Sequence, residues 1–157
     1  MISKSYLMGL GGAVILLAGL SLYNSLELSM QYEPVQAEVD SVEKDCFIAG
    51  YRKKIVHTDT NELAYMECDL APIVASQHGM SKSNIKVRYR IEYTYQYPAN
   101  GAWYDGKYTD KVSYVAVEEE GEDPWYEGKV FKVYVHKKNP EKSRVVKGDT
   151  EFDEGSS

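Results

Sequence analysis

Two cysteines and three histidines are the side chains of this chain best suited to covalent or metal chemistry. They are Cys46 and Cys68, and His57, His78 and His136. Two lone cysteines in an oxidising compartment are typical of a structural disulfide, and their spacing is not the C-x-x-C of redox proteins. Zinc held by Cys46, His57 and Cys68 is an alternative, although it fits no usual ligand spacing. We predict a Cys46–Cys68 disulfide, no metal and no cofactor.

Other groups that could do chemistry lack the surroundings that such chemistry needs. The acidic run from Glu118 to Asp123 suggests calcium, but it lacks the alternating ligands and closing Glu of a calcium loop, so a solvated loop is favoured. Ser76 and Ser81 have no nucleophile-elbow context, and no glycine-rich phosphate loop is present. We predict no catalytic residue and expect that the protein is not an enzyme.

Aromatic side chains are the remaining candidates for binding. The chain has 14 tyrosines against three phenylalanines, and tyrosine suits half-buried sheet faces and wet interfaces because it has an apolar body and a polar tip. An aromatic patch for contact with a protein or a sugar is predicted at Trp103, Tyr104, Tyr108, Trp125 and Tyr126. The alternative is that most of these rings simply cover the sheet.

Near the N-terminus, residues 6–23 form an 18-residue stretch without a charged side chain. As a helix it would rise about 27 Å, close to the hydrocarbon thickness of a bilayer. We predict a cytoplasmic N-terminus at 1–5, a transmembrane helix at 6–28 and a linker at 29–34. The alternative is a cleaved signal peptide, but the candidate cleavage sites lack the small-residue pattern that cleavage needs.

Flanking charge predicts the orientation of this helix. Lys4 precedes it, and acidic residues from Glu27 to Glu43 come before the next basic residue, Lys44. The positive-inside rule therefore places the protein in the plasma (inner) membrane as a single-pass protein, with its C-terminal domain periplasmic or extracellular. Small residues let membrane helices pack closely, so we expect other membrane protein subunits, besides lipid, as partners. The predicted helix-packing positions are Gly9, Gly12, Ala13 and Gly19.

The charge of the rest of the chain excludes one large class of partner. Beyond residue 22 there are 17 Lys and Arg against 24 Asp and Glu, a net charge of −7. Binding of phosphate backbones needs a basic face. We therefore expect no nucleic acid as a partner.

Hydrophobic periodicity predicts the architecture of the domain, which we place at residues 35–147. In residues 85–97 every odd position is Ile, Val or Tyr and every even position is polar, which indicates a long strand with one buried face. Further strands are predicted at 35–42, 103–117, 129–135 and 143–147. The fold class is therefore mainly β, a small antiparallel sheet or barrel-like domain. Residues 148–157 are predicted to be an acidic disordered tail.

The C-terminal part of the chain resembles a known family. Its segment from Gly128 to Ser143 is similar to the "G-x-x-V-x-V-Y-Y-x-P-x-N-P-x-x-S" ending of domain-of-unknown-function family 3592. Lys137 or Lys138 stands where that family often carries Asp or Asn before Pro, and residues 45–84 look like an insertion. The matching residues are Gly128, Val133, Tyr134, Asn139, Pro140 and Ser143. The resemblance implies a small membrane-tethered β-domain and no particular activity.

These features favour action by contact over catalysis. The leading hypothesis is a non-catalytic accessory or scaffold subunit of a membrane protein complex, which acts through its transmembrane helix and its extracytoplasmic β-domain. The alternative is an extracytoplasmic ligand-binding or sensing module whose site is the aromatic patch.

Overall fold

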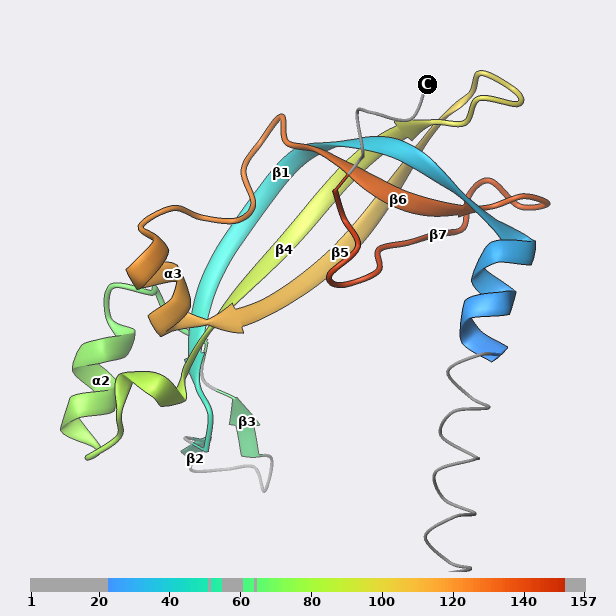
Figure 1. Ribbon diagram of the computed structural model, residues 1–157. Coiled ribbons are helices and arrows are strands. Elements are labelled where there is room, and N and C mark those ends of the chain that lie inside the picture. The colour runs from blue at the N-terminus through green and yellow to red at the C-terminus, as the bar shows by residue number, and fades with distance from the viewer. Residues whose placement is uncertain (1–22, 51, 55–60, 64, 152–157) are drawn as a thin grey trace, which may run out of the picture.

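A bent antiparallel sheet forms the body of the protein (Figure 1). The computed structural model describes residues 23–50, 52–54, 61–63 and 65–151. Its strands are β1 (Tyr32–Ile48), β2 (Arg52–Lys54), β3 (Asn61–Leu63), β4 (Ile85–Gln96), β5 (Trp103–Ser113), β6 (Val130–His136) and β7 (Ser143–Arg144). The main sheet has the order β5-β4-β1-β6-β7 and is barrel-like, and β2 and β3 pair separately. The prediction of a mainly β, antiparallel domain is confirmed.

The helices of the described part are short. They comprise residues 23–31, α2 (Ala71–Gln77), the 3-10 turn η1 (Lys82–Asn84) and α3 (Tyr114–Glu120). None of the helices in these ranges is long and apolar enough to cross a membrane. Most of the predicted transmembrane segment, residues 6–22, lies outside the described residues. In Figure 1, α2 and α3 lie at one end of the sheet, and the helix at 23–31 lies at the other.

The central strand, β1, changes its buried phase partway along. Val35, Ala37 and Val39 are buried at alternate positions, whereas Cys46 and Ile48 are fully buried near its end, with Phe47 between them largely buried as well. Val39 pairs with Tyr93 while Ser41 pairs with Glu92, so Asp40 is an extra residue in a β-bulge. A bulge bends its strand and increases the twist. Because of this bend, the 17-residue strand can pair with β6 through Tyr32–Glu38 and with β4 through Ala37–Ile48.

Strand β4 supplies much of the core, as its alternation predicts. Tyr89, Ile91, Tyr93 and Tyr95 are almost fully buried, whereas Arg90 and Glu92 are exposed. The buried tyrosines reach polar partners with their hydroxyl groups, as buried tyrosines usually do. The Tyr95 hydroxyl donates to the carbonyl oxygen of Pro140 at 2.5 Å, and the Tyr93 hydroxyl lies 2.7 Å from Ser143 Oγ. These bonds fasten β7 and the loop before it to the inner face of β4.

Gly106 of β5 leaves room for the ring of Tyr93, its partner in the β4–β5 register. A Cβ atom at position 106 would lie 2.2 Å from Cζ of Tyr93. We expect Gly106→Ala to lower the free energy of unfolding by about 1–3 kcal/mol, as overpacking of a core does. Urea unfolding measures the loss, and Lys107→Ala on the outer face is the control. An unchanged stability would mean that the ring moves aside at no cost.

Two boundaries differ from the predictions at the ends of the domain. Residues 29–34 are not a linker, because helix occupies residues up to 31 and β1 begins at Tyr32. The described part of the tail, 148–151, is not detached either. The amide of Lys132 donates to the carbonyl oxygen of Thr150, and the side chain of Asp149 bonds with those of Lys132 and Tyr134. Asp149 therefore fastens the start of the tail to β6.

The segments between the strands contain helices that were not predicted from the sequence. The strand predicted at 103–117 ends at Ser113, and residues 114–120 form α3 where a strand end and an acidic loop were predicted. Tyr114 and Val117 pack against the core from one face of α3, and Gly121 ends the helix in the left-handed conformation. Helix α2 buries Ala71 and Ala75.

Candidate interaction surfaces

The structure does not bring the five predicted aromatic contact residues into one patch. Trp103 and Tyr126 are exposed, with 66% and 59% of their surface accessible, while Trp125 is buried. Tyr104 and Tyr108 are half-buried and pack against the core. The reason is the two-residue period of β5, which places Trp103 on the opposite face from Tyr104. The prediction of a joint aromatic patch is therefore wrong, and Trp103 must be considered alone.

Trp125 packs on the inner face of the sheet, where it is hydrogen-bonded to the buried carboxylate of Asp110. Its indole Nε1 donates to Asp110 Oδ2 at 2.9 Å, and its ring meets those of Tyr108 and Phe131 edge to face, with centroids 5.9 and 5.1 Å away. The other Asp110 oxygen has no hydrogen bond in good geometry from the described residues, but Lys147 Nζ lies 3.2 Å away as an ion-pair partner. Asp110 was missed, although it shares the inward phase of Tyr108. This arrangement positions Trp125 and presents no reactive group to solvent.

The outer face of β1, β4 and β5 carries a ladder of ion pairs. Arg88 binds both carboxylate oxygens of Asp45, Arg90 contacts Glu43 at 2.7 Å, and Lys107 contacts Glu92 at 2.8 Å. The hydrogen bond with Lys107 lowers the pKa of the Glu92 carboxyl. Exposed pairs of this kind contribute little to stability individually. Each carboxylate has a basic partner, so these acids are not a free acid–base pair.

Trp103 lies at the end of this ladder, in a shallow groove on the outer face. The groove has a volume of about 380 Å³. It is lined by Pro34, Val35, Gln36, Ala37, Glu38, Thr94, Gln96, Pro98 and Trp103. Glu38 is the one charged side chain in this lining. An exposed tryptophan in mostly uncharged surroundings can contact another protein at little desolvation cost.

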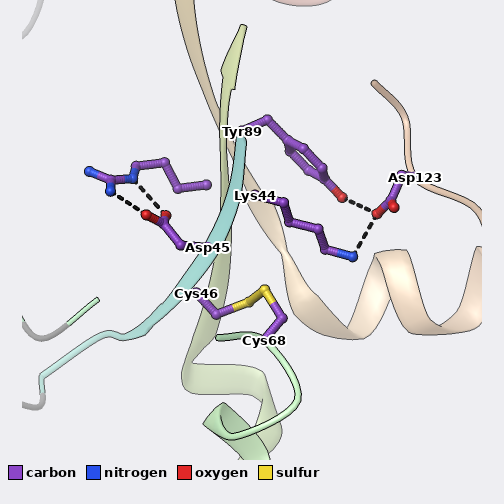
Figure 2. The surroundings of a disulfide bond; sticks show 7 residues. Lys44, Asp45, Cys46, Cys68, Tyr89 and Asp123 are labelled. Atoms are coloured by element: carbon purple, nitrogen blue, oxygen red, sulfur yellow. Dashed lines mark hydrogen bonds and ion pairs between the residues drawn. A yellow bond between two sulfur atoms is a disulfide. The ribbon is translucent and has the colours of Figure 1, made fainter. Parts of the chain in front are cut away.

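At the opposite end, the predicted disulfide is confirmed (Figure 2). Cys46 of β1 and Cys68 are bonded with a Cα–Cα distance of 4.9 Å, which leaves no thiolate for zinc. His57, the third zinc candidate, lies outside the described residues. Cys46 also exchanges two backbone hydrogen bonds with Met66, each 2.8 Å long. The bridge therefore fixes the chain just before α2.

Beside the disulfide, Asp123 joins two strands of the chain (Figure 2). Its Oδ1 accepts from Tyr89 Oη at 2.6 Å and from Lys44 Nζ at 2.8 Å. Burial raises the pKa of the Asp123 carboxyl, but these two hydrogen bonds outweigh burial, so the net pKa lies below the ordinary value. Burial and the bond to Asp123 raise the pKa of the Tyr89 phenol. Asp123 acts here as a structural acceptor.

The acidic run does not form a cation site in the structure. Glu118 pairs with Lys82 at 3.0 Å, and Asp123 is occupied as just described. Within the described ranges no group of three His, Cys, Asp or Glu side chains could hold a metal ion.

His136 Nδ1 accepts from the backbone amides of Lys138 and Asn139 at 3.1 Å, so it caps a turn.

The helix at 23–31 joins the sheet without an intervening loop. The backbone amide of Lys137 donates to the carbonyl oxygen of Gln31 at 2.8 Å, and Lys137 Nζ donates to that of Ser29 at 3.3 Å. The ring of Tyr32 also meets that of His136 edge to face, at 5.1 Å. These contacts hold the helix against the turn after β6. The predicted helix-packing residues Gly9, Gly12, Ala13 and Gly19 lie outside the described residues.

Comparison with known proteins gives no family for this chain. No protein-family model, no curated protein and no solved structure matches it.

Proposed function

We propose that the protein is a non-catalytic accessory or scaffold subunit of a membrane protein complex. Its N-terminal helix anchors it, and its β-domain contacts a partner outside the cytoplasm. The observation that carries this proposal is the exposed Trp103 in its mostly uncharged groove. Tryptophan is enriched among the few residues that supply most of the binding energy of protein interfaces.

The junction between helix and sheet supports the same proposal. A flexible linker would let a tethered domain move freely, but here β1 follows the helix directly and Lys137 bonds to its last turn. Such a junction holds the domain at a fixed angle to the helix. This arrangement suits a scaffold, because a domain that is already held in place loses less conformational entropy when its partner binds.

Recovery of partners from gentle detergent extracts tests the proposal. We expect Trp103→Ala to reduce stoichiometric recovery of partner proteins by about tenfold or more, as loss of a central interface residue does. Replacing Gly12 and Gly19 with Leu should preserve insertion but also weaken recovery, because it overfills a close helix contact. Recovery is measured by mass spectrometry and normalised to membrane-inserted protein.

The matched control is Tyr126→Ala, which removes a similarly exposed aromatic ring that does not line the Trp103 groove. Its recovery should equal that of the native chain. Unchanged recovery in both the Trp103 and the glycine variants would overturn the scaffold proposal. A thermal shift with a small molecule or glycan, lost in Trp103→Ala and without a stoichiometric partner, would favour a ligand-binding or sensing module instead.

A further inference from the structure

A groove of about 600 Å³ lies beside the junction of the helix at 23–31 with the turn after β6, and residues of both line it. The helix lines it with Tyr23, Leu26 and Met30, which recur at the i, i+3 and i+7 spacing of a single helical face. All three are strongly exposed, and Met30 has 73% of its surface accessible. A soluble helix normally turns such a stripe toward a core, so this stripe lacks its usual cover.

The facing wall of the groove is basic. It is formed by His136, Lys137 and Lys138, and both lysines are exposed. Lys142 follows in the loop before β7 and Arg144 lies in β7, against the single acid Glu141. Glu27 is the one carboxylate among the groove residues. The turn is thus locally cationic on a domain whose overall charge is strongly negative.

The groove lies where the uncharged N-terminal stretch meets the domain. Residues 6–23 end on Tyr23, the first described residue of the helix that lines the groove. Residues 23–30 rise about 10 Å along a helix. The headgroup layer on each side of a bilayer is about 5–7 Å thick, so the helix and the reach of a lysine side chain together match it. Lys138 can therefore extend toward headgroups beside the helix while its stem covers apolar surface.

We propose that the groove and its basic turn dock onto the anionic phospholipid surface around the anchor. Tyr23, Leu26 and Met30 meet the boundary of the acyl chains, and Lys137 and Lys138 meet headgroup phosphates. Apolar stripes flanked by lysines bind anionic membranes in this way. The inference rests on the membrane anchor of the proposed function. It adds that the charge of the lipid sets the orientation of the β-domain relative to the membrane.

The test uses the full chain in nanodiscs of phosphatidylcholine alone or mixed with phosphatidylglycerol. An environment-sensitive fluorophore is attached at Asn139→Cys, at the exposed tip of the turn, because the two native cysteines are already bonded. Nitroxide on lipid headgroups quenches the fluorophore when the turn lies at the surface. We expect quenching to be about threefold stronger in the anionic discs than in the neutral ones. This difference should disappear in roughly 1 M salt, where screening is nearly complete.

The variant Lys137→Gln with Lys138→Gln should lose the dependence on anionic lipid. Lys82→Gln with Lys107→Gln removes the same charge elsewhere and should retain it, and a fluorophore at Glu119→Cys on α3 should stay unquenched. Equal quenching in both lipids, or an unchanged response in the Lys137 and Lys138 variant, overturns the docking. Resistance to carbonate extraction is measured in parallel: an inserted chain without lipid dependence contradicts only the docking, and a chain that fails to insert contradicts the anchor as well.

Discussion

Ile91→Ala is expected to lower the free energy of unfolding by about 2–5 kcal/mol, the range of large-to-small core substitutions. Ile91 lies in the middle of β4 with 1% of its surface accessible, between β1 and β5 in the sheet. Removing its side chain leaves a cavity beside the rings of Tyr89 and Tyr93, and a tightly packed sheet collapses poorly into such a space. Urea unfolding at neutral pH gives the change directly.

The neighbouring residue Arg90 provides the control, because it projects from the opposite face of the same strand. Its contact with Glu43 is an exposed ion pair, with 51% and 66% of the two side chains accessible. Arg90→Ala should therefore cost under about 0.5 kcal/mol, as most surface changes do. Comparable losses for Ile91→Ala and Arg90→Ala would contradict a sheet with one buried face.

The long strands could be predicted because their polar and apolar residues alternate without interruption. The bulge at Asp40 was harder to predict, since one extra residue shifts the phase between Val39 and Val42 and makes the second half of β1 look irregular. Helix α3 was missed because valine favours strands. The pairing of Tyr114 with Val117 at i, i+3, followed by glutamates and Gly121, was the available helical signal.

The candidate sites likewise include one that the sequence predicts and others that depend on the folded structure. The pairing of the two cysteines was predicted from their number and from the expected oxidising compartment. The aromatic residues were grouped by their nearness in sequence, but period two along β5 separates Trp103 from Tyr104, and the bond with Asp110 draws Trp125 inside. The groove beside the helix at 23–31 depends on contact between segments more than 100 residues apart, such as Lys137 with Ser29. No local pattern encodes such a contact.

Loss of the Cys46–Cys68 bond should cost about 3 kcal/mol of unfolding free energy. The two cysteines are 22 residues apart, and a bond that closes a loop of this length restricts the unfolded chain by about that amount on the chain-entropy estimate. The double variant Cys46→Ala with Cys68→Ala tests this in urea. Reduction of the native protein is an independent route to the same state, and the two losses should agree within the cost of the buried Cys46 side chain.

Besides this global loss, α2 should open locally more often, because the bond fastens the chain just before α2 to β1. Cys68 precedes α2, whose Ala71 and Ala75 are buried, whereas the pairs of β4 with β1 and β5 do not depend on the bond. Amide hydrogen exchange should therefore accelerate more in residues 66–80 of the double variant than in β4, whose amides should accelerate only as far as the global loss of about 3 kcal/mol allows. Equal acceleration in residues 66–80 and in β4 would mean that α2 opens only when the whole sheet unfolds.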